Sequence, residues 1–248
     1  MMTQVKTEAE IERMRTSGQM LAHVLRYLPP MLEAGMTTRE IDNIAAAELE
    51  RLGGKPAFKG FEGYPAVICI AVNDEVVHGI PGMRKLAEGD IVGLDFGVNF
   101  EGMITDAAVT VPVGKISQEA RKLLRATQEA LELGVGEVRG GARIGDISAA
   151  VEARLRRDKL SVIEELGGHG VGHGLHEDPI ILNYGRAGTG MRLKAGMTIA
   201  IEPMATLGRR EIYVADDGWT ILTQDGSLAA QFEHTVLVTE SGFEILTK

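Results

Sequence analysis

The sequence has a single cysteine and no long apolar run, and each shortage excludes a class of protein. Because Cys69 is alone among 248 residues, an intrachain disulfide and a cage of several thiolates around a metal are both excluded. Any metal held by this chain must therefore have oxygen and imidazole ligands. No stretch of about eighteen apolar residues occurs, and the first fifteen residues lack the apolar core of a signal peptide. These features predict a cytoplasmic protein without membrane contact.

Positive charge is scarce as well. The chain has 26 Lys and Arg against 35 Asp and Glu, a formal net charge of -9, so the molecule as a whole should repel nucleic acid and anionic membranes. No sequence-specific nucleic-acid binding is expected. The phosphate-loop pattern GxxxxGK[ST] and the nucleophile-elbow pattern GxSxG do not occur. The glycine-rich segment 134–141 follows a predicted helix rather than a strand, which argues against dinucleotide binding.

A helix–helix–strands order occurs twice along the chain. The first two predicted helices start with capping-box pairs, Thr7 with Glu10 and Thr37 with Glu40, and they end at Pro29 and at Gly53. Strand-like segments follow at 66–72, 90–98 and 103–111. The order then begins again, with helices predicted from about Ser117 to Leu133 and from about Ile144 to Arg157. We expect one catalytic domain over residues 1–248, with repeat halves of approximately 1–114 and 115–248.

Four acidic residues lie in strand-like contexts that match between the halves. A shift of 107 residues places Asp95 over Glu202, and the strand that begins at Asp106 resembles the segment that begins at Glu233. Two such units, each contributing two carboxylates, predict a pseudo-twofold α+β fold with a central antiparallel sheet and a site on the axis.

The first pair of acids is predicted to be opposed across a hairpin. A turn centred on residues 99–102 would make Asp95 face Asp106, with their Cβ atoms about 5 Å apart. Two opposed carboxylates destabilise a sheet unless one is protonated or a cation lies between them. For an isolated pair, a solvent-exposed face is the simpler explanation. The matching acids in the other half favour a metal site instead.

Histidines on a glycine-rich segment could complete such a site. GGHGVGHGLHEDP (167–179) contains His169, His173 and His176, and His78 is a further candidate. Any one of them alone would more often be an ordinary hydrogen-bonded loop residue, but three together with four strand acids favour function. We interpret His23 and His234 as structural, and Cys69 as a buried strand residue rather than a nucleophile.

Taken together, these motifs resemble the methionine aminopeptidases of pita-bread fold. The order Asp95, Asp106, His169 in GGHGVGHGLHEDP, Glu202 in IEP and Glu233 in FEHT is the specific part of the resemblance. Further matching segments at 63–81, 89–97, 216–220 and 227–235 extend it over most of the chain. The length resembles the short type I bacterial form.

The resemblance implies a role for each matching residue. Asp95 would bind one metal ion, Asp106 and Glu233 would bridge two ions, and His169 and Glu202 would bind the other. His78 and His176 would contact the substrate around the scissile amide. The methionine pocket would use Tyr64, Cys69 and Trp219, with Phe61 and Leu175 as neighbours. Phe58, Phe61 and Leu175 stand where the family often has other aromatic residues or cysteine, so the shape of this pocket can differ.

The expected chemistry is hydrolysis by a water molecule activated between two divalent ions, with Glu202 as the proton shuttle. Four carboxylates and one imidazole favour manganese, iron(II) or cobalt(II), with zinc as an alternative. The expected substrates are nascent proteins and peptides that begin with methionine followed by a small residue. The chain's own Met1-Met2 start would then retain its initiator, because the second residue is bulky.

Two rival functions remain open on the sequence. An Xaa-Pro peptidase of the same fold would use similar ligands, and a non-catalytic binding protein could use the same scaffold. We expect a monomer. Work on new chains also suggests docking near the ribosome exit through basic helix ends, namely Arg121, Lys122 and Arg125, or Arg154, Arg156 and Arg157 in the solvated segment 154–159.

Overall fold

The computed structural model describes residues 5–248, so the Met1-Met2 start lies outside the described residues. Two helices, α1 (Glu8–Tyr27) and α2 (Thr38–Leu52), begin at the predicted capping boxes. In each, the threonine hydroxyl accepts a hydrogen bond from the backbone N–H of the glutamate three residues on, and the glutamate carboxylate reaches back to the threonine N–H. Gly53 ends α2 in the left-handed conformation, at φ 82°.

The first half continues with a short helical turn and a sheet. Its elements are η1 (Pro29–Met31), β1 (Lys55–Pro56), η2 (Phe61–Gly63), β2 (Ile68–Val72), β3 (Glu75–Val77), β4 (Ile91–Phe100) and β5 (Met103–Pro112). Strands β1, β4 and β2 are adjacent in the first sheet, and β5 also pairs with β4. All the paired strands in this sheet run antiparallel.

The predicted hairpin register is wrong by two residues. Phe100 pairs with Met103, so the turn contains only Glu101 and Gly102, both at positive φ (48° and 84°) as in the tight turns that favour hairpins. Asp95 therefore pairs with Ala108 rather than with Asp106. Since the shift is two residues, both aspartates stay on one face of the sheet as diagonal neighbours.

The second half repeats two helices followed by strands, here divided among several small sheets. Its elements are α3 (Gln118–Gly136), α4 (Ile144–Arg157), β6 (Ser161–Val162), β7 (Gly167–Gly170), β8 (Glu177–Leu182), β9 (Thr198–Ile201), β10 (Met204–Thr206), β11 (Ile212–Val214), β12 (Ile221–Thr223), β13 (Ala229–Gln231), β14 (His234–Val238) and β15 (Phe243–Ile245). The order β15-β14-β9-β7-β8 forms the largest of these sheets. The bounds of α4 are those predicted.

Helix α3 runs three residues past its predicted end at Leu133. Gly134 lies in the helix, where a glycine ordinarily costs stability. A Cβ atom built on Gly134 would lie only 2.8 Å from a methyl group of Val151 in α4. The glycine thus allows α3 and α4 to approach closely, and the buried Val135 continues the apolar face of α3.

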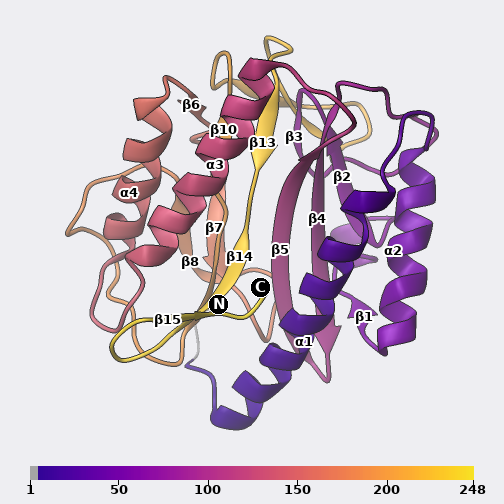
Figure 1. Ribbon diagram of the computed structural model, residues 1–248. Helices are drawn as coiled ribbons and strands as arrows, with labels where there is room; N and C mark the ends of the chain where they lie inside the picture. Colours follow the sequence, from indigo (N-terminus) through magenta and orange to yellow (C-terminus); the bar gives the residue numbers. More distant parts are fainter. Residues whose placement is uncertain (1–4) are drawn as a thin grey trace.

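Each pair of helices covers the outer side of its own strands, with the strands of both halves in between (Figure 1). The apolar faces of α1 and α2 pack on β2 and β4, and those of α3 and α4 pack on β9 and β14. Among residues 5–248, every helix is too short or too polar to span a lipid bilayer.

A narrow join connects the halves along β5 and the β13–β14 segment (Figure 1). Ala108 and Glu233 exchange two backbone hydrogen bonds. On either side of this pair, a threonine hydroxyl takes the place of backbone–backbone hydrogen bonds. The hydroxyl of Thr235 accepts from the N–H of Asp106 and donates to its carbonyl, and the hydroxyl of Thr110 does the same with Gln231. This symmetric pattern makes Thr110 in the first half equivalent to Thr235 in the second. The structural alignment of the halves therefore differs by two residues from the sequence alignment that places Asp106 over Glu233.

Candidate metal centre

Two rows of residues cross the sheets on one face and bring the predicted acids together. Cys69 pairs with Asp95, Asp95 with Ala108, and Ala108 with Glu233. Extending the β9–β14 register by one residue places Glu202 beside Glu233. Directly opposed residues project to the same face of a sheet. Asp95, Glu233 and Glu202 therefore lie in one row, although they come from both halves of the chain.

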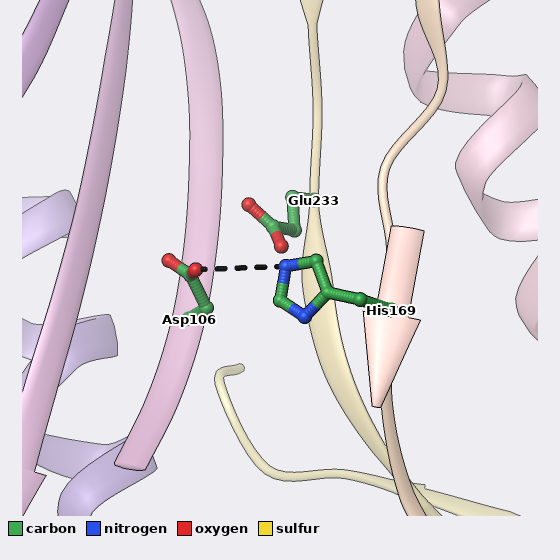
Figure 2. Close-up of side chains that lie close together, drawn as sticks. All are labelled: Asp106, His169 and Glu233. Atoms are coloured by element: carbon green, nitrogen blue, oxygen red, sulfur yellow. Dashed lines mark ion pairs between the residues drawn. The ribbon is translucent and has the colours of Figure 1, made fainter. Parts of the chain in front are cut away.

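Asp106 and His169 lie in the neighbouring row. Asp106 is bonded to Thr235, and the β7–β9 register, extended by one residue, places His169 beside Ala200. Figure 2 shows Asp106, His169 and Glu233 with their side chains pointing toward one another from three different strand segments. One ligand atom from each of these three lies within 4.8 Å of the other two.

Hydrogen bonding orients the imidazole of His169. Its Nδ1 lies 2.9 Å from the carbonyl oxygen of Gly170, an acceptor, so Nδ1 carries the proton. Nε2 is left with a free electron pair, 3.5 Å from Glu202 Oε1 and 4.0 Å from Asp106 Oδ2. A backbone carbonyl that fixes the histidine tautomer in this way is typical of metal ligation.

The four carboxylates are buried together with too few neutralising partners. Burial raises the pKa of Asp95 to about 7, and burial together with the charge of neighbouring acids raises the pKa of Asp106, Glu202 and Glu233 well above the usual range. Burial lowers the pKa of His169 to about 3, so this histidine is neutral and does not offset the negative charge.

Unpaired oxygens in the cluster fit a cation. Asp95 Oδ1, Asp106 Oδ1 and Glu233 Oε1 are buried and have no hydrogen-bond partner among residues 5–248. Buried polar atoms are almost always paired, so three unpaired carboxylate oxygens lining one cavity fit a positively charged partner. Carboxylate oxygen and neutral imidazole are ligands that divalent metal ions accept. The residues present therefore fit a metal centre.

Chelator-treated protein is expected to lose thermal stability as the pH rises above about 6.5. An acid whose pKa is raised by folding binds more protons in the folded chain, so the free energy of unfolding falls from its unfolded pKa, about 4, up to its folded pKa. That window reaches about 7 for Asp95, and burial also raises the pKa of Glu233 well above its usual range. The lowered pKa values of His78 and His169 act oppositely, but only below about 6.5, where the unfolded imidazole binds a proton.

Melting temperatures at about pH 6.5 and about pH 8.5 measure this effect. Without metal, the melting temperature should fall between the two; manganese should raise it most at the higher pH, where it competes with fewer protons. An equal melting temperature at both pH values in chelated protein would contradict the burial of ionisable acids.

A cavity of about 130 Å³ contains the predicted site residues. Its lining includes all five predicted metal ligands and both substrate histidines, His78 and His176. The predicted pocket residues also line it, namely Phe61, Tyr64, Cys69, Leu175 and Trp219. The rings of Tyr64 and Trp219 meet edge to face at 5.1 Å, and His176 meets His169 at 4.4 Å between ring centroids. Burial lowers the pKa of His78 to about 4 and also lowers that of His176, so both imidazoles are neutral near pH 7.

The remaining histidines lie outside the cavity. His173 Nε2 lies 2.8 Å from Glu10 on α1, so this member of the glycine-rich segment is not brought to the acids. His23 contacts Glu48, and His234 contacts the hydroxyl of Thr247, as expected of structural residues. Arg154 was predicted to be solvated, but it is buried, at 8% exposure, and pairs with Glu129 and Asp158.

Three residues at the site are missing from the predictions made on the sequence. Gln231 donates from Nε2 to Glu202 Oε2 at 3.2 Å, and Asn183 donates to the backbone carbonyl of Glu202 at 2.9 Å. Glu62 also lines the cavity. For Gln231 a signal was available, because it lies two residues before Glu233. Nothing in the sequence around Asn183 indicates its contact.

Comparisons with known proteins show which family and fold this chain is similar to. The model of metallopeptidase family M24 matches residues 12–240. Methionine aminopeptidase 1 of Bacillus subtilis is 44% identical over 98% of this chain and 98% of its own length. The crystal structure of methionine aminopeptidase from Thermotoga maritima superposes with a TM-score of 0.98 at 44% identity over the whole of both chains.

A prolidase structure from Pyrococcus furiosus shares the fold at lower similarity. Its TM-score is 0.81 at 24% identity, and the match covers 98% of this chain but 65% of the prolidase. The α+β pita-bread fold predicted from the sequence is confirmed by these structures.

Proposed function

The chain belongs to metallopeptidase family M24 and is a methionyl aminopeptidase, and on this basis we propose that it removes the initiator methionine from nascent proteins and peptides with a small second residue, using two divalent ions. The carrying observation is the buried cluster of four carboxylates and one neutral imidazole on one face of the joined sheets. Nascent chains are made in the cytoplasm, where this activity would be exercised.

Each acid has a place in the proposed centre that agrees with the two rows. Asp95 would hold one ion, His169 and Glu202 would hold the other, and Asp106 and Glu233 would contribute ligands to both. Glu233 lies between Asp95 and Glu202 in the first row, which supports its bridging role. Manganese, iron(II) or cobalt(II) suit this oxygen-rich set better than zinc alone. When bound, such ions neutralise the acids, polarise the scissile carbonyl and supply a water molecule that loses its proton near neutral pH.

Glu202 handles the proton in this proposal. Its carboxylate is buried, and Gln231 donates to one of its oxygens while the other faces His169. Asn183 holds its backbone carbonyl, so the side chain is directed from a fixed point after β9. Glu202 accepts the proton of the attacking water and passes it to the leaving amine, the general acid–base role that a carboxylate ligand can fill.

His78 and His176 hold the scissile amide. Both are neutral, and each can donate one N–H hydrogen bond; His176 donates to the oxygen that gains negative charge. Phe61 packs against His176 edge to face, with ring centroids 5.3 Å apart. The methionine side chain would lie among Tyr64, Cys69 and Trp219, an apolar surface that suits a thioether.

A second, open groove gives the rest of the substrate a path away from the metal centre. This groove of about 490 Å³ shares His78, His169, His176 and Glu202 with the cavity. It continues along the exposed side of β8, where Ile180 is 68% exposed. A small cavity for the first residue and a larger, open groove for the following ones suit removal of one residue from a chain end.

A peptide pair tests the proposed function against its nearest rival. Manganese-loaded protein should cleave Met-Gly-Met-Met and leave an Ala-Pro peptide intact, because the apolar cavity is suited to a long thioether side chain. Release of free methionine or alanine can be followed by mass spectrometry. Cleavage of only the Ala-Pro peptide would identify an Xaa-Pro peptidase, and metal-loaded protein that is inactive on both would favour a binding protein.

Docking at the ribosome is a further part of the proposal. Because Arg154 is buried, it is removed from the set of basic residues that could make this contact. The exposed members of the basic helix ends are Arg121, Arg125, Arg156 and Arg157. Arg156 is paired with Glu152 on its own helix, which weakens its contribution to a positive patch.

A further inference from the structure

A buried ion pair connects the segment before α1 to the loop that carries His176. Lys6 Nζ lies 2.6 Å from Glu177 Oε2, and the two side chains are 0% and 3% exposed. The pair spans 171 residues of sequence, so only the fold brings it together. A buried pair of this kind is costly to form and costly to break on one side only.

The other oxygen of Glu177 holds the backbone of the same loop. Oε1 accepts hydrogen bonds from the N–H groups of His173, at 2.6 Å, and Gly174, at 3.0 Å. Glu177 thus closes the loop 173–177 from its end, directly beside His176. One oxygen of the carboxylate therefore pairs with Lys6, and the other accepts hydrogen bonds from the loop.

The lysine stem packs against the start of the loop. A Cβ atom built on Gly172 would lie 2.4 Å from Lys6 Cε, so the glycine gives the lysine room to pass. The backbone N–H of Lys6 donates to Gly196 at 2.8 Å, which fixes where the side chain starts. Glu10 on α1 makes a second contact with this loop, because its carboxylate lies 2.8 Å from Nε2 of His173.

We propose that Glu177 is a positioning residue for catalysis: it holds the backbone of the loop 172–176 so that His176 lies beside His169, and Lys6 offsets its buried charge. This inference rests on the proposed function, because His176 matters only if it contacts the substrate. The ring of His176 meets Phe61 and His169 edge to face, and among residues 5–248 it has no side-chain hydrogen bond. Its orientation therefore depends on the backbone of the loop, which Glu177 holds.

Two double variants isolate the loop contacts from the ion pair. Lys6→Met with Glu177→Gln, and Lys6→Met with Glu177→Leu, both remove the buried charges, so neither leaves one charge unpaired. They differ in one respect, since glutamine keeps an acceptor for the N–H groups of His173 and Gly174, whereas leucine has none. Arg154→Met, at a buried ion pair remote from the cavity, serves as the control for a general loss of stability.

The kinetic constants should separate these variants on a Met-Gly peptide at a temperature where all are folded. The leucine variant should lose about tenfold or more in kcat, because a small displacement of a catalytic group costs rate steeply. Its KM and metal content should stay near wild type. The glutamine variant should recover most of the rate, and Arg154→Met should keep wild-type kcat.

Equal kcat in the two double variants would overturn the inference, as would a loss of metal that matches the loss of rate. Either result with an active wild-type protein leaves the proposed function standing. A wild-type protein that does not cleave the peptide removes both.

Discussion

Glu202→Gln is expected to reduce the turnover of a Met-Gly peptide about a hundredfold to ten-thousandfold, the range that general acid–base catalysis contributes. Glutamine has nearly the size of glutamate and keeps one oxygen as a ligand, but it cannot accept and release a proton. The fold should survive, because the contacts that direct this position come from Asn183 to the backbone and from Gln231 to one side-chain oxygen. Substrate affinity should change much less than turnover.

Metal content, peptide binding and turnover have to be measured on the same preparation of this variant. Glu240→Gln, at an exposed position, is the matched control for the loss of one negative charge and should behave as wild type. A loss of metal proportional to the loss of rate would show that Glu202 is a ligand only. Turnover within threefold of wild type in a fully metallated variant would reject the proton shuttle.

Asp106→Asn is expected to lose metal and activity together. Asp106 has a buried oxygen without a hydrogen-bond partner among residues 5–248, and both its backbone groups are fixed by Thr235. An amide offers one good acceptor oxygen in place of two charged ones, so it could not fill the bridging role proposed for Asp106. At the same time, the substitution relieves repulsion with Asp95 and Glu202, which raise the pKa of Asp106.

The metal-free variant should therefore be at least as stable to heat as metal-free wild type, although it binds less metal. Bound metal can be counted by elemental analysis and unfolding followed by calorimetry. Wild-type metal content in Asp106→Asn would contradict the bridging role of this residue.

Local signals in the sequence predict the helices well. The capping boxes at Thr7 and Thr37 satisfy backbone donors within a few residues of themselves, so they can be recognised without tertiary information. The end of α3 could not be predicted in this way. A glycine is typical of a helix end, but Gly134 lies inside α3. Its lack of a side chain leaves room for Val151 on another helix.

The acids of the site were predictable from their contexts, but their arrangement was not. A two-residue turn and a four-residue turn both fit residues 99–102, and only the structure selects the first, which pairs Asp95 with Ala108. The join between the halves depends on the hydroxyls of Thr110 and Thr235, which replace backbone hydrogen bonds across 121 and 129 residues of sequence. Such pairings leave no local pattern.

The positions of the histidines on the glycine-rich segment also depend on contacts between distant parts of the sequence. His169 and His176 line the cavity while His173 turns to Glu10, a contact made across 163 residues. Spacing alone could not separate the three, because the loop does not follow a regular period. The prediction that Arg154 is solvated is wrong for a similar reason, because its partner Glu129 lies on another helix.

The most direct test of the two-ion centre is a manganese titration of chelator-treated protein, with bound metal per chain and turnover of a Met-Gly peptide measured on the same samples. Turnover should be absent without metal, because the buried acids then have neither a cation to offset their charge nor a source of activated water. It should rise as manganese binds and reach its maximum at two ions per chain. Full turnover in metal-free protein, or a maximum at one ion per chain, would contradict the centre proposed for Asp95, Asp106, His169, Glu202 and Glu233.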